Sequence, residues 1–151
     1  MARWTRGEAE VEGLVAAADL QKLTGGAANG DRLLQKAATT LETARSAIDR
    51  DPDSAFVLSY DASRQALTAL LAHQGLRPTT KGGHYAVERA IRAQFGAGFR
   101  QFSALRRRRN ELEYPERPGD DATNEEAPEA VECAQAIITA AEGLVDQLGL
   151  F

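Results

Sequence analysis

A chain of 151 residues has the length of one domain, and a composition of 43% hydrophobic and 26% charged residues is too apolar for a disordered protein. A net charge of −4 argues against a surface that is basic throughout, the usual electrostatic footprint of a nucleic-acid-binding protein. Because Cys133 is the single cysteine, no internal disulfide can form, and we predict no structural zinc, no other metal site and no cofactor.

The sequence contains no segment typical of a membrane span or a secretory signal. No apolar run approaches the roughly 18 residues that a bilayer requires, and residues 1–10 lack the apolar core of a signal peptide. We therefore expect a cytoplasmic protein that folds as one domain over residues 1–151. Within it, residues 1–28 should form a peripheral N-terminal segment with a helix, and residues 115–127 an acidic loop.

Helical periodicity runs through almost the whole chain, in which alanine is abundant and β-branched residues are sparse. This pattern predicts an all-α fold. The expected helices, in chain order, cover residues 8–23, 30–49, about 54–75, 81–95, 98–113 and 125–148.

The breaks between these helices fall mainly at glycine and proline. Asp53 or Ser54 is expected to cap the third helix, and Thr79 or Thr80 the fourth. Pro115 disfavours helical geometry at the residue before it, so the fifth helix should stop there. Because short connections join long amphipathic helices, we predict an up-and-down antiparallel bundle with four to five core helices.

Positive charge is concentrated in the fifth expected helix. Residues 100–110 contain five arginines and no acid, whereas residues 115–128 contain five acids and one arginine. A basic patch therefore adjoins an acidic loop along the chain, and the patch is the feature that needs a functional explanation.

Arg109 falls inside the apolar stripe of its own helix. On a helical wheel of about 100° per residue it lies between Phe102 and Leu105. Arg106 and Glu113 project within about 60° of it, at the spacings of three and four that allow side chains to meet. A buried arginine at this position requires a partner or a ligand.

The residues around Arg109 allow two interpretations. In the first, two arginines, the amide of Asn110 and the carboxylate of Glu113 converge on a groove where guanidinium groups hold a phosphate and stabilise developing charge. In the second, Arg109 and Glu113 form a partly buried ion pair that fixes helix register, while Arg107 and Arg108 face solvent. Residue chemistry alone leaves both open.

Residues 105–115, LRRRRNELEYP, resemble the signature of HEPN (higher eukaryotes and prokaryotes nucleotide-binding) domains. In that signature an arginine, commonly followed by asparagine, precedes a histidine by four to six residues. Arg109 and Asn110 match its first half. Residues 60–67, 74–78 and 82–84 also resemble bacterial HEPN domains, and the resemblance spans roughly residues 53–148.

The resemblance implies a helical domain that dimerises, places two copies of the motif at a composite site, and cuts RNA without a metal ion. Arg109 would then contact phosphate, and Asn110 would orient the site. The further residues expected to bind phosphate or RNA are Arg64, His84, Arg106 and Arg108.

The histidine of the motif is absent. Its window holds a tyrosine, a proline and a glutamate, and the chain's histidines are His73 and His84. Histidine suits proton transfer because its pKa lies near neutrality, whereas tyrosine and glutamate need large pKa shifts. The sequence resembles a HEPN branch that ends in Arg-Asn-x-x-Glu-Tyr-Pro. Glu113 and Tyr114 are therefore either catalytic residues of that branch or structural ones.

Two other groups have alternative roles. His84 follows two glycines at a helix start, where backbone donors favour an anion, and it either supplies the absent imidazole or is an exposed or capping residue. Tyr60, Asp61 and Arg64 share one side of a helix. They either line a groove beside Arg109 or brace the bundle internally, because buried polar groups need partners.

Three functional hypotheses follow. The first is a HEPN-like ribonuclease, a toxin or defence component that acts on RNA as a homodimer, beside an antitoxin or a nucleotidyltransferase partner. The second is a noncatalytic module that binds RNA, a nucleotide or an acidic partner protein. The third is a dimerisation partner whose arginines serve only an interface. Any RNA ligand should be single-stranded, because side chains distinguish bases poorly in A-form duplexes.

Overall fold

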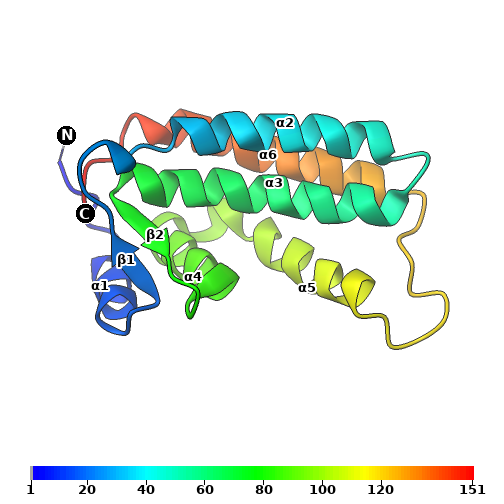
Figure 1. The fold of residues 1–151 in the computed structure, drawn as a ribbon, viewed down its shortest axis with the longest axis horizontal. Helices are drawn as coiled ribbons and strands as arrows, with labels where there is room; N and C mark the ends of the chain where they lie inside the picture. The colour runs from blue at the N-terminus through cyan, green and yellow to red at the C-terminus, as the bar shows by residue number, and fades with distance from the viewer. Residues whose placement is uncertain (1) are drawn as a thin grey trace.

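Helices make up most of the structure (Figure 1). The computed structural model describes residues 2–151, except for the side chains at positions 97 and 98. Within that range the α-helices are α1 (Glu8–Ala16), α2 (Asp31–Ala47), α3 (Pro52–His73), α4 (Gly83–Phe95), α5 (Gln101–Glu113) and α6 (Glu126–Val145), and the 3₁₀ helices are η1 (Gly25–Ala27) and η2 (Gly96–Phe99). The predicted all-α fold is confirmed, and every helix after the first has bounds within three residues of the prediction.

The long helices run alternately up and down, as predicted. α3 packs against α2, α4, α5 and α6, which makes it the central helix of the bundle. In Figure 1, α2 and α6 lie along one side of α3, while α4 and α5 lie along the other. The largest apolar side chains that are almost fully buried between these helices are Leu41, Tyr60, Leu67, Leu70, Leu71, Ile91 and Phe102.

The start of α3 differs from the prediction by one cap residue. Asp51, not Asp53 or Ser54, is the N-cap, and its side chain accepts a hydrogen bond from the backbone N–H of Ser54 at 3.1 Å. Asp53 has a different role, because its Oδ1 accepts a hydrogen bond from the backbone N–H of Ala122 at 2.6 Å. It therefore ties the loop before α6 to the first turn of α3.

The first helix is shorter than predicted. It ends at Ala16 instead of residue 23, because Ala18 adopts a left-handed conformation with φ of 62°. The backbone N–H groups of Ala18 and Asp19 then donate to the carbonyls of Val15 and Leu14 at 3.0 and 2.9 Å, which closes the helix with a Schellman motif. The prediction was wrong because this position usually carries glycine, and an alanine gives no such signal.

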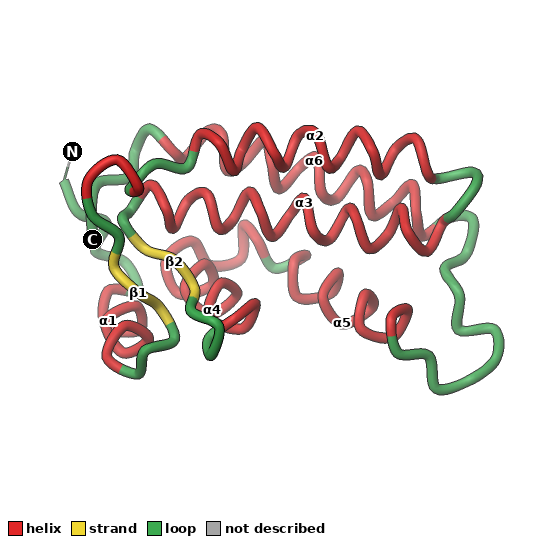
Figure 2. Tube along the Cα trace, in the orientation of Figure 1, coloured by secondary structure: helices red, strands yellow, loops and turns green. Residues whose placement is uncertain are grey.

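A small sheet was not predicted. Strand β1 (Leu20–Lys22) pairs antiparallel with β2 (Leu76–Pro78), so that Leu20 faces Pro78 and Lys22 faces Leu76. Figure 2 shows the two strands beside α1 and α4. Three-residue strands leave too short an alternation to be distinguished from loops in the sequence. The sheet attaches the N-terminal segment to the turn that leads into α4.

Helix α4 begins without a side-chain cap, so the predicted capping by Thr79 or Thr80 is wrong. The N-cap is Gly82, and Thr79 lies in the turn three residues before it. Its hydroxyl accepts a hydrogen bond from the Gly82 N–H at 3.0 Å and donates to the carbonyl of Ala18 at 2.6 Å. Thr79 thereby fixes the turn that positions the first residues of α4.

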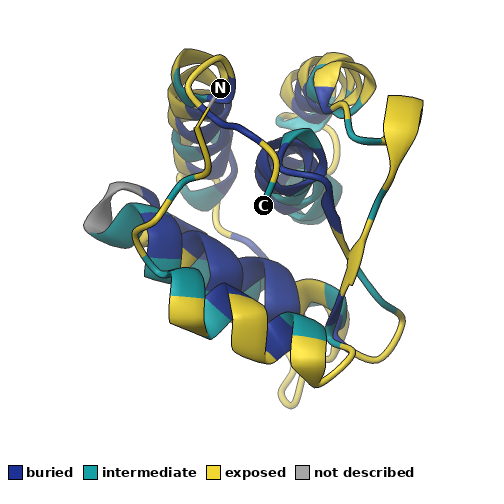
Figure 3. Ribbon diagram, turned by 90° about the vertical axis from the view of Figure 1, so that its left-hand side faces the viewer, coloured by how far each residue is buried: buried dark blue, intermediate teal, exposed yellow. Residues whose placement is uncertain are grey.

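The two ends of the chain meet at one end of the bundle (Figures 1 and 3). The backbone N–H of Phe151 donates to the carbonyl of Gln74 at 2.8 Å, and the guanidinium of Arg3 stacks over the Phe151 ring at 3.9 Å. Figure 3 also shows that the buried sides of the helices face one another.

No helix among the described residues combines the length and apolar character needed to cross a membrane.

Candidate functional site

A buried tyrosine in α3 brings three helices together. Tyr60 is 0% exposed, and its ring stacks on Phe102 of α5, with 5.2 Å between centroids and 9° between planes. Its hydroxyl lies 2.8 Å from Nδ1 of His84, at the start of α4. The guanidinium carbon of Arg109 lies 5.7 Å from the centroid of the Tyr60 ring. We call Tyr60, Arg64, His84 and Arg109 the Tyr60 cluster.

The two arginines act electrostatically on both titratable groups of the Tyr60 cluster. Burial raises the pKa of Tyr60 to about 12 against the opposing charges of Arg64 and Arg109, so the phenol stays protonated at neutral pH. Burial, together with the charges of Arg64 and Arg109, lowers the pKa of His84 below 6.5. His84 is therefore a neutral imidazole at neutral pH, and it is exposed enough for a ligand to reach it.

Both arginines of the cluster have unused donors. The Nε atoms of Arg64 and Arg109 are buried, and neither has a hydrogen-bond partner among the described residues. Arg109 otherwise contacts its own helix, with Nη2 3.5 Å from a carboxylate oxygen of Glu113 and Nη1 3.3 Å from Oδ1 of Asn110. A single ion pair of that length, between side chains 22% and 35% exposed, is weak. The guanidinium can therefore reorient toward an incoming anion.

A buried carboxylate that the sequence pattern did not indicate lies beside the cluster. Glu88, one turn after His84 on α4, forms ion pairs with Arg106 of α5 and with Arg92 at 2.8 Å, and it accepts a hydrogen bond from Ser103. Burial would raise the pKa of Glu88, but hydrogen bonds from Ser103 and Arg106 and the charges of Arg106 and Arg92 keep it below the usual value. Arg106 thus joins α5 to α4. In the sequence, the one sign that Glu88 could lie near the site was its position four residues after His84, on the same side of α4.

Arg108 contacts α6 and the loop before it. Its Nε donates to Glu126 at 2.7 Å and its Nη1 donates to Glu111 at 3.0 Å. Its Nη2 donates to the backbone carbonyls of Asp120 and Asp121 at 3.4 and 3.2 Å. The hydrogen bond to Glu126 is the main cause of a raised pKa at Arg108. These contacts occupy all three guanidinium nitrogens. The second interpretation expected Arg108 to face solvent, and for this residue it is wrong.

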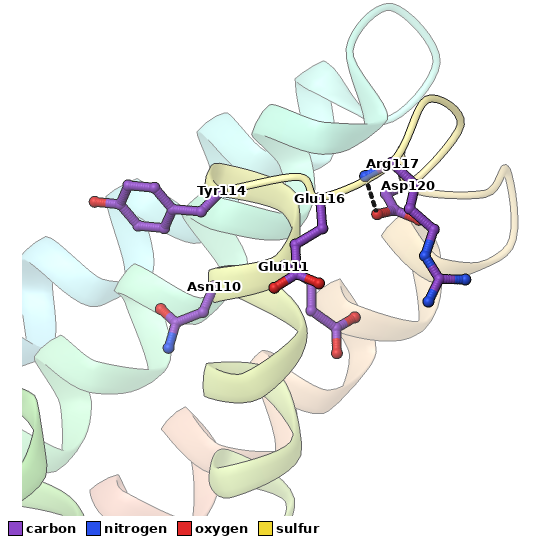
Figure 4. Close-up of a pocket in the computed structure, with 6 residues that line it drawn as sticks. All are labelled: Asn110, Glu111, Tyr114, Glu116, Arg117 and Asp120. Atoms are coloured by element: carbon purple, nitrogen blue, oxygen red, sulfur yellow. Dashed lines mark hydrogen bonds between the residues drawn. The ribbon is translucent and has the colours of Figure 1, made fainter.

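Asn110 and Tyr114 lie at a cavity of about 650 Å³ between the end of α5 and the following loop (Figure 4). Figure 4 shows both side chains pointing in the same direction, away from the loop. The other lining residues include the carboxylates of Glu111, Glu116 and Asp120 and one arginine. This acidic lining repels phosphate, so the cavity does not suit RNA. Tyr114 itself is 73% exposed.

The remaining candidates, Asp61 and His73, both lie on α3. Asp61 acts electrostatically on Tyr60 and His84, but within the described range it forms no ion pair with Arg64. His73 lies at the C-terminal end of α3, and its Nδ1 is buried without a hydrogen-bond partner in the described structure. No group of three or more His, Cys, Asp or Glu side chains among those described has the arrangement of a metal site.

Comparison with protein families gives one match. The family model described as HEPN domain covers residues 31–144, which include all of α2 to α5, nearly all of α6, and every residue of the Tyr60 cluster. The chain belongs to the HEPN domain family. No curated protein and no solved structure matched the chain.

Membership of the HEPN family indicates an RNA-related or nuclease-like function in general terms, and HEPN domains often act with RNA or with partners. In this HEPN domain the segment that should carry the motif histidine is the start of the loop after α5. His84 on α4 and Arg109 on α5 both lie against Tyr60, His84 at its hydroxyl and Arg109 at its ring. The segment before residue 31, with α1 and β1, lies outside the family match.

Proposed function

We propose that this HEPN domain binds single-stranded RNA at the Tyr60 cluster and cleaves it without a metal ion. One observation carries the proposal. The buried ring of Tyr60 holds the imidazole of His84 through its hydroxyl and lies against the guanidinium of Arg109. An arginine for phosphate and an imidazole for proton transfer are thereby combined in a chain whose motif lacks its histidine.

In the proposed reaction, the 2′-hydroxyl of the RNA attacks the adjacent phosphorus. His84 Nε2 accepts the hydroxyl proton while the new bond from the 2′-oxygen to phosphorus forms and the bond from phosphorus to the 5′-oxygen breaks. The leaving 5′-oxygen takes a proton from solvent water, the imidazolium of His84 returns its proton to solvent, and the products are a 2′,3′-cyclic phosphate and a 5′-hydroxyl. A neutral imidazole is the required form of the base, and the lowered pKa of His84 supplies it at neutral pH.

The arginines would stabilise the charge that develops on the phosphate. The Nε atoms of Arg64 and Arg109 are buried and have no hydrogen-bond partner in the described structure, so an oxyanion gains these donors when the guanidinium groups reorient toward it. Arg109 contacts Asn110 and Glu113, which would orient it from its own helix. Guanidinium groups suit this role because they offer forked donors and remain charged.

A second candidate function, RNA binding without cleavage, is favoured by the hydrogen bond of Tyr60. A protonated phenol that is fully buried needs an acceptor, and His84 Nδ1 is the one at hand. If Tyr60 donates to Nδ1, the proton of the neutral imidazole lies on Nε2, and His84 is then a donor to phosphate. Catalysis requires the other tautomer, in which Nδ1–H donates to the Tyr60 oxygen and Nε2 is the base.

The proposal also covers the biological role, the location, the assembly state and the partner of this HEPN domain. We propose a toxin or defence component that folds as one domain over residues 1–151, works in the cytoplasm as a homodimer, and is controlled by an antitoxin or nucleotidyltransferase partner. Light scattering of the purified chain measures its assembly state, and a monomer would contradict the proposed homodimer.

The deciding experiment is cleavage of a mixed RNA pool in EDTA by the wild-type chain and by Arg109→Ala and His84→Ala. Removing the base should slow cleavage by about 10²- to 10⁴-fold, and removing the arginine by about 10²- to 10³-fold. Arg32→Ala, an exposed change on α2, is the charge-matched control. Circular dichroism verifies folding. If wild type binds but does not cut RNA, the noncatalytic function replaces the catalytic one.

A further inference from the structure

A second pocket lies between α4 and α5, beside the Tyr60 cluster. It has a volume of about 440 Å³. Its side chains come from α4, η2, α5 and the junction between them, and they comprise arginines, one glutamate, one serine and an apolar floor. The lining residues used here are Glu88, Arg92, Phe99, Arg100, Ser103 and Arg107.

The pocket carries uncompensated positive charge. Three arginines line it against one carboxylate, that of Glu88. The oxygens of Glu88 contact Arg92, Ser103 and Arg106, and within the described residues Glu88 forms no ion pair with the other two arginines of the pocket. Arg100 and Arg107 are exposed, and neither forms an ion pair within the described residues. Two free guanidinium groups at one pocket favour a phosphate.

The floor of the pocket is apolar and partly aromatic. Ile91, Phe99 and Phe102 line it, and all three are largely buried in the bundle. A ligand with both a phosphate and a flat ring suits such a pocket, because nucleic-acid bases stack on aromatic rings and on guanidinium planes. Inorganic phosphate would use only the arginines.

The pocket and the Tyr60 cluster share structural elements. Phe102 forms part of the pocket floor and also stacks on Tyr60 at 5.2 Å. Arg106 pairs with Glu88 on the pocket side, and its charge acts on His84 on the cluster side. Along α5, Arg100 and Arg109 are separated by about 14 Å at 1.5 Å per residue. Because nine residues at about 100° each turn through about 180° (mod 360°), the two arginines project from opposite sides of α5, so one RNA strand that contacts both must pass around this helix.

We propose that the pocket between α4 and α5 is a second RNA subsite, in which Arg100 and Arg107 bind a phosphate and the aromatic floor takes a base of the strand held at the Tyr60 cluster. This inference rests on the proposed function, since it extends the same RNA site. It assigns recognition of the strand outside the scissile linkage to residues that take no part in the chemistry.

The test is fluorescence anisotropy with a labelled, 2′-O-methylated single strand of about ten nucleotides, which binds but cannot be cut by 2′-oxygen attack. Arg100→Gln with Arg107→Gln should weaken binding by about 10- to 100-fold and reduce the salt dependence by about one phosphate contact. The matched control is Arg32→Gln with Lys36→Gln, two exposed positive charges on α2, and it should change affinity by less than about threefold. Circular dichroism checks that both double variants fold.

Cleavage of a dinucleoside monophosphate separates this proposal from the catalytic one. The substrate is too short to use the pocket, so the Arg100 and Arg107 variant should cut it at the wild-type rate. If the wild type never cuts but the pocket variant weakens binding, the subsite stands and the catalytic proposal fails. If cutting depends on Arg109 while the pocket variant binds like the α2 control, the subsite is wrong. Absence of any RNA binding would overturn both.

Discussion

The hydroxyl of Tyr60 and Nδ1 of His84 lie 2.8 Å apart, although 24 residues separate them in the chain. The pair links α3 to the first turn of α4, and the ring of Tyr60 stacks on Phe102 of α5. Because Tyr60 is fully buried, it does not reach a ligand itself. Its role in the proposed site is to position the imidazole, and that role can be separated from its contribution to stability.

Tyr60→Phe keeps the stacked ring and removes only the hydroxyl. We expect the free energy of unfolding to fall by about 0.5–1.5 kcal/mol, the usual loss of one hydrogen bond. In cleavage assays, kcat should fall by about 10- to 100-fold with little change in KM, because His84 loses its orientation. Tyr85→Phe, which removes an exposed hydroxyl from the residue after His84, is the matched control. An unchanged kcat in Tyr60→Phe would show that Tyr60 is only structural.

Cleavage should persist to lower pH than it would with a histidine of ordinary pKa as the base. Burial and the charges of Arg64 and Arg109 lower the pKa of His84, so the neutral base persists below pH 6.5 and the rate declines only at lower pH. Arg64→Gln removes one of these charges and should move the acidic limb of the pH–rate profile to higher pH. The profile and the proton resonances of His84 measure this pKa independently. A limb that does not move in Arg64→Gln would exclude His84 as the base.

The same pKa shift predicts a change in stability with pH. The unfolded chain binds a proton at His84 near pH 6.5, and the folded chain only at lower pH. As pH falls below 6.5, the unfolded state is therefore favoured and the free energy of unfolding decreases until the folded pKa is passed. Urea denaturation at several pH values measures this decrease. His84→Gln should lack this component, and an identical pH dependence in both proteins would contradict the prediction.

Features that depend on one helix were predictable from the sequence, whereas contacts between helices were not. Arg109 was placed in the apolar stripe of α5 by helix geometry alone, and its Nε is indeed buried. The pairing of His84 with Tyr60 depends on how the turn after β2 packs onto α3, which no local pattern encodes. Glu88 was missed because a single glutamate in an amphipathic helix usually faces solvent, and only its arginine and serine partners permit burial.

Arg108 and Arg107 should show opposite effects when each is replaced by glutamine. Arg108 connects α5 to Glu126 of α6 and to two loop carbonyls, so its loss should lower the free energy of unfolding by about 1–2 kcal/mol with little effect on RNA affinity. Arg107 is exposed without an ion pair in the described range, so its loss should leave stability unchanged but weaken RNA binding. Urea denaturation and anisotropy measure the two effects. Equal losses of RNA affinity would instead assign Arg108 to the RNA site.

Ala18→Gly should stabilise the protein. Ala18 has φ of 62°, a left-handed conformation that costs an alanine about 1–2 kcal/mol and a glycine almost nothing. The greater freedom of glycine in the unfolded chain offsets part of this gain, so we expect a net rise of about 0.5–1 kcal/mol in the free energy of unfolding. The control is Ala17→Gly, next to it at φ of −79°, where only the entropic loss applies and stability should fall. If both changes lower the urea midpoint alike, Ala18 is not strained, and another cause must end α1 at Ala16.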